Sequence, residues 1–420
     1  MSRPAHAIRP RDRSRPWDIV LYGASGFTGR LTAEVMAGFE PDVRWAIAGR
    51  NRPKLEQVRA ELDLPPGVSR PEVLIADSTD RGALDLIARD ASVVCTTVGP
   101  YAKYGTELVA ACVEHGTDYC DLTGETQFIR RMVDQWHDRA VETGARIVHC
   151  CGFDSIPSDL GLLALQRALV DATGEPADHV VYALKSARGG ASGGTIASML
   201  NVLEEARDPA VRRILGHPYA LNPEGDRRGP DGSDLMTARY DRDLKQWTAP
   251  FVMAAINTRV VRRSHSLMGR PWGEDFRYRE VSAMGTGAKG ATRAYSMAAG
   301  LGAFIGATAV KPLRALLEKT VLPSPGEGPD QAAREKGRFA VDLVGFRGGA
   351  EVGRAKVRGS MDPGYGATSF MLAESARCLA LDGATLTSPG GVLTPAVAMG
   401  ARLTQRLNDV GVVTFEAQVG

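Results

Sequence analysis

The sequence predicts an α/β protein whose N-terminal part forms a doubly wound parallel sheet and whose second part is an α+β domain with a mostly antiparallel sheet. Over the first 150 residues, short β-rich runs alternate with amphipathic helical runs. Parallel strands need such crossover helices. A glycine-rich turn follows the first β-rich run, and after Pro157 the β-rich runs recur with long connections, a pattern typical of antiparallel strands.

Six strands and the helices between them account for the N-terminal region. We expect the strands at Asp18–Tyr22, Val43–Ala48, Glu72–Ala76, Ser92–Thr97, Asp118–Leu122 and Arg146–Cys150. Apolar residues at helical spacing predict helices between them, as in the set Leu108, Ala111, Cys112 and His115 and the set Ile129, Met132, Val133, Trp136 and Ala140.

The second region begins with a helical pattern over Leu160–Val170. Its expected strands are His179–Lys185, Asn257–Arg263, Phe276–Val281, Arg338–Gly345 and Glu351–Gly359. The polar stretch Asn222–Asp234 is typical of a surface loop, and Pro323–Gly328 of a linker. After Gly366 the chain is helical again, with one face formed by Met371, Leu372, Ser375 and Leu379.

Composition excludes several classes of protein. Apolar residues make up 44% of the chain and charged residues 24%, as in a folded globular protein. Lysine and arginine total 51 against 49 aspartates and glutamates, so no net field attracts nucleic acid. The six cysteines form no C-x-x-C pair, which argues against a metal site and favours reduced, buried thiols. The arginine-rich residues 1–16 have no apolar run behind them, so we expect a solvated tail in a cytoplasmic protein.

One uncharged segment, Tyr295–Val310, bears on membrane contact. It is shorter than the roughly 20 apolar residues that a spanning helix needs, and glycine and alanine dilute it. It could be a core helix or a surface that touches lipid, which would place the protein at the periphery of the plasma membrane.

The strongest motif lies directly after the first expected strand. Gly23, Gly26 and Gly29 follow one another at a spacing of three, and a helical pattern begins near Phe27. Glycine suits a sharp turn at the first position, the approach of a pyrophosphate at the second, and close helix–strand packing at the third. The N-terminus of the helix would point N–H groups at the phosphates. We therefore predict a Rossmann-type dinucleotide site, with a plain strand–turn–helix as the alternative.

The end of the second strand discriminates between dinucleotides. Arg50 and Asn51 lie where an NAD enzyme usually carries an acidic residue for the ribose 2′-hydroxyl. An arginine can instead hold a 2′-phosphate with its planar fork of donors. We therefore predict NADP(H) as the cofactor, the alternative being a solvated arginine at the start of a loop.

Two further strand ends complete the expected site. Asp77 closes the third strand, where it could accept from the adenine amino group or cap the next helix. Thr97, Gly99 and Pro100 close the fourth strand, where small residues let the nicotinamide ribose approach the backbone. Because ligands of open α/β sheets lie beyond the carboxyl ends of the strands, we expect these residues to share one site.

With these residues in place, the sequence resembles the saccharopine dehydrogenase-like oxidoreductases, and most closely their trans-acting enoyl reductase branch. The matching segments are LYGASGFTGRLTAE (21–34), AIAGRN (46–51), TTVGPYAKYG (96–105), GTDYCDLTGE (116–125), CGFDSIPSDLG (151–161), SGGTIASM (192–199), NTRVVRRS (257–264) and GVLTPAVAMG (391–400). They occur in order along nearly the whole chain.

This resemblance implies both a fold and an activity. It implies an NADP-binding Rossmann domain over residues 17–156, completed by C-terminal helices at about 366–410, and an inserted α+β domain for substrate and dimerisation over residues 157–365. It further implies a homo-oligomer that reduces an enoyl thioester on a carrier domain of a polyketide synthase, in lipid biosynthesis. Cofactor roles would fall on Gly23, Ser25, Gly26, Phe27, Thr28, Gly29, Arg50 and Gly99.

Enoyl reduction needs a proton for the α-carbon and a group that stabilises the enolate. Tyr101 and Tyr104, next to the expected nicotinamide, could donate through their hydroxyls or could pack as an aromatic lid. Asp121, Thr123 and Glu125 cluster at another strand end, where Thr123 or Glu125 could instead start a helix.

Two later segments could hold substrate. Asp154 and Ser155 precede a helix with Pro157 in its first turn, so either residue could be the cap of that helix. A glycine cluster before the next helical pattern could bind a phosphate or a thioester oxygen, or could be a plain flexible loop. Its candidate residues are Ser192, Gly193, Gly194 and Thr195.

Three functions stay open on the sequence alone. The first is reduction of an enoyl thioester. The second is a dehydrogenase of the amino-acid type, whose substrate carboxylates would need converging arginines. The third is a non-catalytic NADP-binding or lipid-associated scaffold that uses Tyr295–Val310 as its contact surface.

A cluster of arginines could contact a partner. Arg259, Arg262 and Arg263 could dock an acidic carrier protein or form a solvated strand face.

Overall fold

The computed structural model describes residues 13–189, 193–309 and 328–420. Contacts divide the chain into two compact units. Unit 1 comprises Met1–Ile156 and Tyr365–Val412, and unit 2 comprises Pro157–Gly364 and Val413–Gly420. The chain therefore leaves unit 1 once, returns to it, and ends with a segment of unit 2.

Unit 1 contains a seven-stranded sheet of order β13-β6-β5-β4-β1-β2-β3, in which every neighbouring pair is parallel. The strands are β1 (Trp17–Tyr22), β2 (Trp45–Gly49), β3 (Glu72–Ile75), β4 (Ala91–Thr96), β5 (Asp118–Asp121), β6 (Arg146–Val148) and β13 (Gly391–Leu393). Ile19, Val20 and Leu21 are fully buried because helices cover both faces of the sheet. The predicted doubly wound parallel sheet is confirmed.

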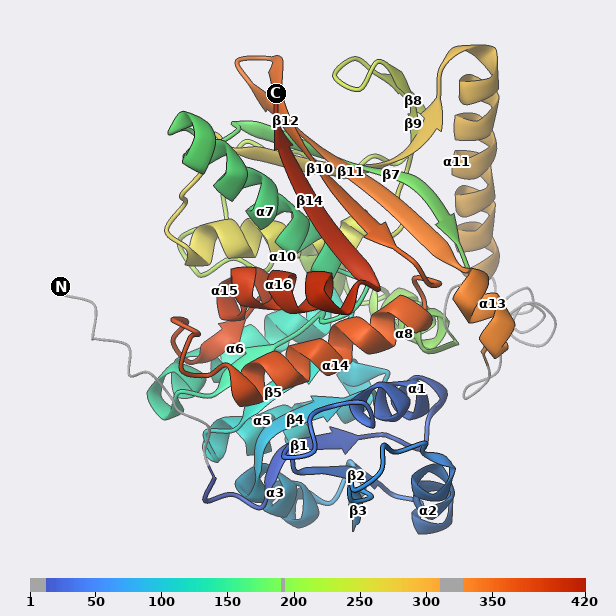
Figure 1. The fold of residues 1–420 in the computed structure, drawn as a ribbon. Coiled ribbons are helices and arrows are strands. Elements are labelled where there is room, and N and C mark those ends of the chain that lie inside the picture. Colours follow the sequence, from blue (N-terminus) through green and yellow to red (C-terminus); the bar gives the residue numbers. More distant parts are fainter. Residues whose placement is uncertain (1–12, 190–192, 310–327) are drawn as a thin grey trace. The chain divides into compact units, whose positions relative to one another are not determined.

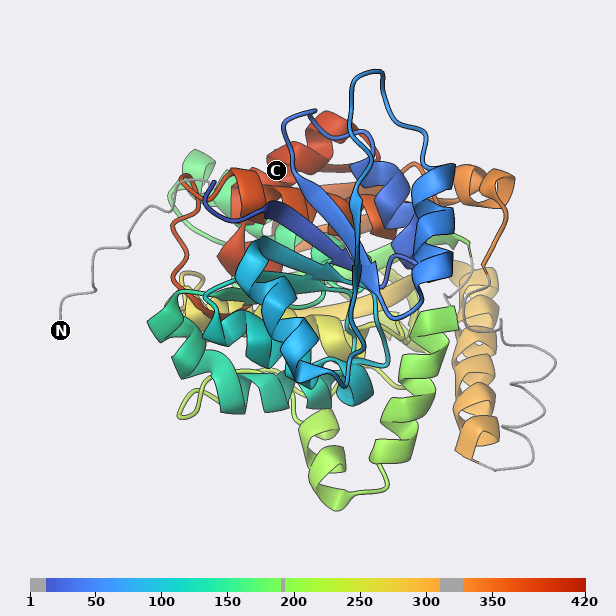
Figure 2. The same ribbon diagram turned by 90° about the horizontal axis from the view of Figure 1, so that it is seen from below.

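Helices lie on the two faces of this sheet in separate groups. α1 (Phe27–Met36) packs with α14 (Gly366–Leu381) on one face, and α3 (Arg81–Asp90) packs with α5 (Thr106–Glu114) on the other (Figures 1 and 2). The C-terminal segment therefore supplies both a helix and the edge strand of unit 1. The other helices of unit 1 are α2 (Arg52–Glu61), α4 (Tyr101–Tyr104), α6 (Thr126–Thr143), α15 (Pro395–Ala398) and α16 (Gly400–Val410).

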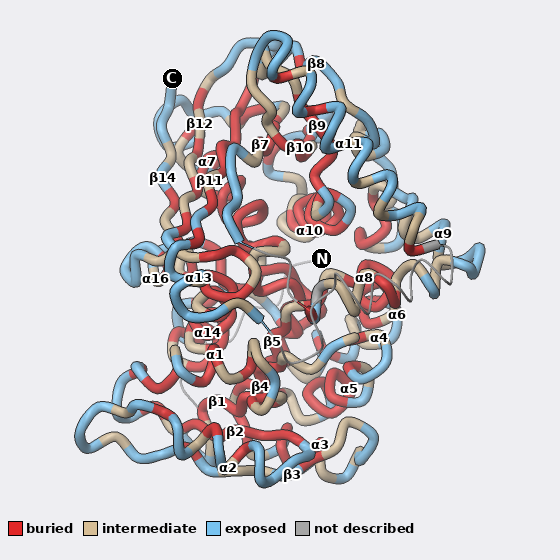
Figure 3. Tube along the Cα trace, turned by 90° about the vertical axis from the view of Figure 1, so that its right-hand side faces the viewer, coloured by how far each residue is buried: buried red, intermediate tan, exposed pale blue. Residues whose placement is uncertain are grey.

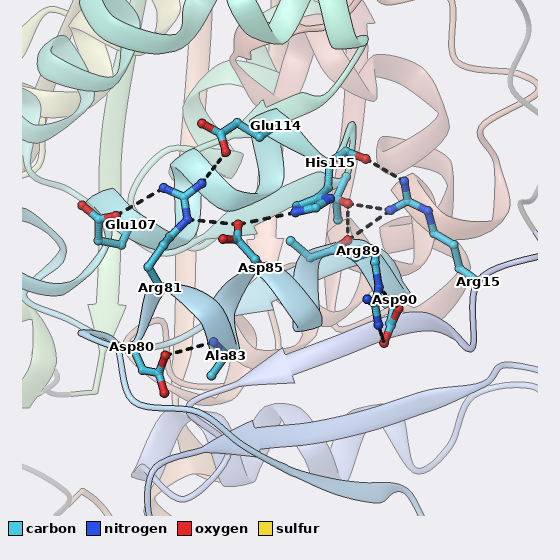
Figure 4. Close-up of polar contacts among 12 residues, drawn as sticks. Arg15, Asp80, Arg81, Ala83, Asp85, Arg89, Asp90, Glu107, Glu114 and His115 are labelled. Carbon is cyan, nitrogen blue, oxygen red and sulfur yellow. Dashed lines mark hydrogen bonds and ion pairs between the residues drawn. The ribbon is translucent and has the colours of Figure 1, made fainter.

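Two arginines join α3 to α5 and its neighbouring loop (Figure 4). Arg81 donates to Asp85 of its own helix at 3.0 Å and reaches Glu114 of α5. Arg15 donates to the carbonyl oxygens of Ala88, at 3.2 Å, and His115, at 2.7 Å. Arg15 therefore belongs to the fold, and the solvated tail expected over residues 1–16 ends before it. Residues 1–12 lie outside the described part of the chain.

Unit 2 contains a second seven-stranded sheet, of order β14-β12-β11-β7-β10-β9-β8. Only the pair β7 and β10 is parallel within it, so the predicted mostly antiparallel sheet is confirmed. The strands are β7 (His179–Arg188), β8 (Arg239–Asp241), β9 (Gln246–Ala249), β10 (Arg277–Gly285), β11 (Arg338–Arg347), β12 (Ala350–Gly359) and β14 (Val413–Val419).

Helix α7 (Ile156–Thr173) packs closely on this sheet. Leu165 and Leu169 lie so near Gly345 of β11 and Gly353 of β12 that a Cβ on either glycine would approach them to 3.0–3.3 Å. The other helices are α8 (Gly193–Glu205), α9 (Pro209–Gly216), α10 (Ala254–Leu267), α11 (Gly287–Ala309) and α13 (Gln331–Lys336).

The strand predicted at Asn257–Arg263 is wrong, because these residues lie in helix α10. Every residue from Ile256 to Ser264 is buried, so no polar face marks the helical period. A short buried helix cannot be told from a buried strand by periodicity alone, and Val260 and Val261 add β propensity.

Helix α11 contains Tyr295–Ala309 of the uncharged segment, whose last residue, Val310, is not described. Most of the helix is exposed or half-buried (Figure 3), so the core-helix interpretation is wrong. No helix among the described ranges is long and apolar enough to cross a bilayer.

Candidate cofactor and active site

The strand order of unit 1 reverses at β1. From β1 the chain proceeds to β2 and β3 on one side, whereas β4, β5 and β6 extend on the other. Ligands of open α/β sheets bind at this switch point, beyond the carboxyl ends of the strands. Tyr22 of β1 is in register with Thr96 of β4, and the Thr97 hydroxyl donates to the carbonyl oxygen of Gly23 at 3.2 Å. The turns that follow β1 and β4 are therefore held side by side.

Packing within the protein requires glycine at two of the three motif positions. Gly23 has a φ of +93°, and a Cβ there would lie 2.6 Å from Cγ2 of Val98. A Cβ on Gly29 would lie 2.2 Å from the carbonyl oxygen of Gly23, because α1 crosses the turn closely. These two glycines are explained by the fold itself.

Gly26 is different, because nothing in the described part of the chain demands a glycine there. Its φ is −79°, which any residue can adopt, and a Cβ would meet only the Gly23 carbonyl oxygen at 3.4 Å. The residue is exposed at the N-terminus of α1. The space that a side chain would fill fits the approach of a dinucleotide pyrophosphate.

The N-terminus of α1 also lacks a side-chain cap, in contrast to the next two helices. Gly26 is its N-cap residue and provides no side-chain hydrogen bond. Asn51 caps α2 by accepting from Lys54 N at 3.0 Å, and Asp80 caps α3 by accepting from Ala83 N at 3.1 Å. An anion bound at α1 would gain from the helix dipole. Ser25, Phe27 and Thr28, which surround Gly26, are half-buried.

Arg50 and Asp77 follow β2 and β3 at the same edge of the sheet. Arg50 is exposed, and no carboxylate of the described chain lies within ion-pair distance of it. Hydrogen bonds from Thr79, aided by the charge of Arg50, lower the pKa of Asp77. Because Asp80 caps α3, the alternative role of Asp77 as that cap is wrong. Asn51, by contrast, uses its side-chain oxygen as a cap.

The turn after β4 contains the other predicted cofactor residues. Gly99 is exposed, Pro100 is half-buried, and the peptide bond between them is cis. Pro100 is also the N-cap residue of α4. Thr97 N donates to the Tyr22 carbonyl oxygen at 3.0 Å, so this turn continues the pairing of β4 with β1.

Tyr101 is buried, and its hydroxyl is occupied by the protein. The hydroxyl donates to the Thr96 carbonyl oxygen and accepts from Leu122 N, each at 3.2 Å. Burial raises the pKa of Tyr101 well above its usual value. The hydroxyl thus joins the ends of β4 and β5. Tyr104, at the end of α4, is 41% exposed and is the tyrosine of the pair that a ligand can reach.

Glu125 holds the start of α4. Its two carboxylate oxygens accept from Tyr101 N at 2.8 Å and from Ala102 N at 3.0 Å. The residue is fully buried and also precedes α6, but its side chain does not cap that helix. Glu125 therefore lies at the start of a helix, as the sequence predicts, but its carboxylate binds the backbone of α4 instead.

A buried polar cluster lies at the ends of β5 and β6. Oδ2 of Asp121 accepts from the Tyr119 hydroxyl at 2.8 Å and pairs with Nδ1 of His149 at 2.7 Å. Oδ1 accepts from Thr123 N at 3.0 Å and Cys150 N at 3.2 Å. Asp121 was among the residues predicted from the sequence, whereas His149 was not. A usable signal was present, since both residues end neighbouring β-rich runs.

Asp154 lies in the turn between β6 and α7 and is half-buried. Burial, together with the charge of Asp121, raises the pKa of Asp154 to about 7. Its carboxyl can therefore hold a proton near neutral pH. Ser155 is fully buried, and its N–H donates to the Gly152 carbonyl oxygen at 3.3 Å.

The second set of substrate candidates belongs to unit 2. Gly193 and Gly194 begin α8; Gly193 is buried and Gly194 is exposed. Ser192 and the side chain of Thr195 lie outside the described residues.

Both interpretations of the arginine cluster on α10 are wrong, because all three side chains are buried. Arg262 donates to Asp231 at 2.7 Å and to the carbonyl oxygens of Pro218, at 2.9 Å, and Tyr278, at 3.0 Å. Arg259 pairs with Asp234, and Arg263 donates to the Leu221 carbonyl oxygen. The stretch Asn222–Asp234 was expected to be a surface loop. Two of its carboxylates, Asp231 and Asp234, instead pair with the buried arginines of α10.

All six cysteines are buried and none is in a disulfide. In the part of the chain that the structure describes, no three His, Cys, Asp or Glu side chains are placed to hold a metal ion.

Comparison with known proteins agrees with this geometry. Residues 19–148 match the family model described as the saccharopine dehydrogenase NADP binding domain. A Mycobacterium tuberculosis protein provisionally named a trans-acting enoyl reductase is 44% identical over 95% of this chain and 97% of its own. The trans-acting enoyl reductase of Mycobacterium ulcerans is 40% identical over the same shares. Among solved structures, apo saccharopine dehydrogenase (L-Glu forming) from Saccharomyces cerevisiae has the same fold, with a TM-score of 0.52 and 15% identity over 96% of this chain and 99% of that one.

Proposed function

The chain belongs to the saccharopine dehydrogenase-like oxidoreductases, in the branch of the trans-acting enoyl reductases, and on this premise we propose that it reduces the double bond of an enoyl thioester. It is an NADP-dependent oxidoreductase. The substrate is our proposal: an acyl thioester carried by a polyketide synthase domain, in the synthesis of a lipid. This substrate proposal is supported by the names of the relatives, which describe them as trans-acting enoyl reductases.

One observation carries the proposal. A glycine turn at a helix N-terminus that has no side-chain cap, and a carboxyl whose pKa burial raises to about 7, lie at the carboxyl ends of strands of one sheet. Reduction of an enoyl thioester needs both a bound reductant and a proton for the α-carbon.

We propose the following roles for the cofactor residues. Gly26 and the N-terminus of α1 would hold the pyrophosphate, Arg50 the 2′-phosphate, and Asp77 the adenine amino group. The backbone of the turn after β4 would face the nicotinamide ribose. The remaining contacts would come from Gly23, Ser25, Phe27, Thr28, Gly29, Asn51, Thr97, Gly99 and Pro100. When bound, NADPH supplies the hydride for the β-carbon.

For the α-carbon we propose that Asp154 supplies the proton. Its carboxyl has a pKa of about 7, which suits a general acid at neutral pH. We propose that Tyr104, which is exposed at the end of α4, contacts the substrate, whereas the Tyr101 hydroxyl is engaged with the backbone. The amino-acid dehydrogenase alternative gains no support from Arg259, Arg262 and Arg263, because each is bound within unit 2.

The test is NADPH oxidation by the purified protein with trans-2-enoyl thioesters of increasing length, carried on coenzyme A and on an isolated carrier domain. We expect NADPH consumption with formation of the saturated thioester. Asp154→Asn should lower turnover without weakening NADPH binding, whereas Asp138→Asn, on the exposed side of α6, should leave both unchanged. NADPH binding without turnover of any enoyl thioester would contradict the proposed substrate while leaving the cofactor site intact.

A further inference from the structure

Helix α11 of unit 2 presents an uncharged surface. No charged residue occurs after Arg293 in this helix, and the described part of unit 2 leaves Tyr295 59% exposed, with Met297 and Ile305 also exposed. Gly290 and Ala294 form the buried side that faces β9 and β10. Figure 3 shows exposed and half-buried residues along nearly the whole helix.

Aromatic side chains extend this surface onto the neighbouring hairpin of β8 and β9. The ring of Tyr295 lies 5.8 Å from that of Trp247, which lies 5.8 Å from that of Tyr240. Tyr240 is exposed and Trp247 is half-buried. Tyrosine and tryptophan, with an apolar ring and a polar end, favour the boundary between lipid headgroups and acyl chains.

Positively charged residues lie in the same two segments as the aromatic row. The hairpin and the first turns of α11 carry five exposed cations that make no ion pair with any described residue: Arg239, Arg242, Lys245, Lys289 and Arg293. Asp241 and Asp243 are the carboxylates of these two segments. Both pair with Arg279, and Asp241 also interacts electrostatically with Arg239, so the two carboxylates leave an excess of positive charge on these two segments.

We propose that α11 and the β8–β9 hairpin form a surface that binds a bilayer containing anionic lipid. An exposed apolar helix with flanking aromatic rings and an excess of cations has the features of a segment that lies in the membrane interface. A second copy of this chain fits the surface less well, because a two-fold contact would bring the cations of both copies together. The proposal does not depend on the proposed enoyl reduction.

Vesicle sedimentation tests the proposal with the full chain. We expect binding to phosphatidylcholine vesicles that contain phosphatidylglycerol, weaker binding in high salt, and little binding to phosphatidylcholine alone. Because each cation near an anionic surface contributes about fivefold, the variant Arg242→Gln/Lys245→Gln should partition about thirtyfold less. Tyr295→Ser/Met297→Ser should also lose binding.

Matched controls separate this surface from general effects. Arg89→Gln/Arg139→Gln removes two exposed arginines of unit 1, and Leu86→Ser removes an apolar side chain of similar exposure, 53%. Both should bind vesicles as the wild type does, and thermal unfolding should show that every variant folds. Equal binding by the surface variants and the wild type, or no preference for phosphatidylglycerol, would overturn the proposal. Dissociation of a dimer by the α11 variant with vesicle binding unchanged would also overturn it, in favour of a second copy.

Discussion

The glycine turn allows a sharp test, because two of its glycines predict opposite effects for the same added methyl group. In Gly26→Ala the new Cβ would lie 3.4 Å from the Gly23 carbonyl oxygen and meet no other atom closely. Alanine reduces the conformational freedom of the unfolded chain, which stabilises the folded state by about 0.4–1 kcal/mol. Alanine is a poorer N-cap than glycine by a similar amount. We therefore expect the free energy of unfolding to change by less than about 1 kcal/mol.

Binding of NADPH should change much more in Gly26→Ala. The methyl group would occupy the space over which the pyrophosphate is proposed to pass. Forcing an extra methyl into a packed contact costs about 1–3 kcal/mol. This corresponds to a Kd for NADPH that rises roughly fivefold to 150-fold.

The matched variant Gly29→Ala should behave in the opposite way. Its Cβ would lie 2.2 Å from the Gly23 carbonyl oxygen and 2.8 Å from the Ala24 Cα, so backbone must move. We expect a loss of about 1–3 kcal/mol or more of stability. For a unit of this size, each kcal/mol lowers the Tm by about 2–4 °C.

Thermal unfolding with and without NADPH measures both effects, supported by a fluorescence titration of the Kd. At NADPH concentrations of about 100 Kd, the wild type should gain about 2.7 kcal/mol. A hundredfold weaker Gly26→Ala variant would gain only about 0.4 kcal/mol under the same conditions. A Gly26→Ala variant with the wild-type Kd would refute the placement of the pyrophosphate, and a Gly29→Ala variant with the wild-type Tm would refute the close packing.

Three further predictions concern charge. Arg50→Asp should raise the Kd for NADPH about tenfold to a hundredfold, since charged hydrogen bonds contribute about 1.5–3 kcal/mol, and affect NADH less; equal effects in dinucleotide titrations would remove Arg50 from the site. Burial raises the pKa of Asp154 from 3.8 to about 7, so the folded state binds this proton more tightly than the unfolded state does. The stability that this proton contributes should therefore be fully present below pH 4 and should be lost as the pH rises through 7. Glu280, whose pKa burial also raises to about 7, adds to the same trend. Asp154→Asn should flatten part of this fall in Tm between pH 5 and pH 8, and an unchanged profile would contradict the assignment. Arg262→Met should cost about 3–5 kcal/mol, because it removes the cation from Asp231, whose side chain is only 7% exposed and would keep only its hydrogen bonds from the Tyr219 hydroxyl and Tyr278 N; a loss of unfolding free energy under about 1 kcal/mol in denaturant would show the ion pair to be unimportant.

Local patterns in the sequence predicted six of the seven described strands of unit 1, but not the edge strand β13, which lies in a tail expected to be helical. The β-rich runs of the sheet and the spacing of Gly23, Gly26 and Gly29 depend on residues close together in the chain. Turn chemistry and hydrophobic periodicity act over such short distances, so they can be identified without tertiary contacts. Position in a parallel sheet then brought Arg50 and Asp77 to the edge that carries the glycine turn.

Only the tertiary structure decided how polar side chains were used. Arg262 on α10 pairs with Asp231, which is 31 residues away in the sequence, and His149 pairs with Asp121, which is 28 residues away. Neither pair therefore forms a local sequence motif. The sequence offered the Tyr101 hydroxyl as a proton donor, but in the structure this hydroxyl is hydrogen-bonded to the backbone at the ends of β4 and β5. Burial changes both the secondary structure of a short apolar run and the role of a charged group, because a desolvated polar atom must find a partner wherever the fold provides one. Partner and burial are properties of the folded chain, which is why sequence patterns could name candidate residues and only the fold shows how their side chains are used.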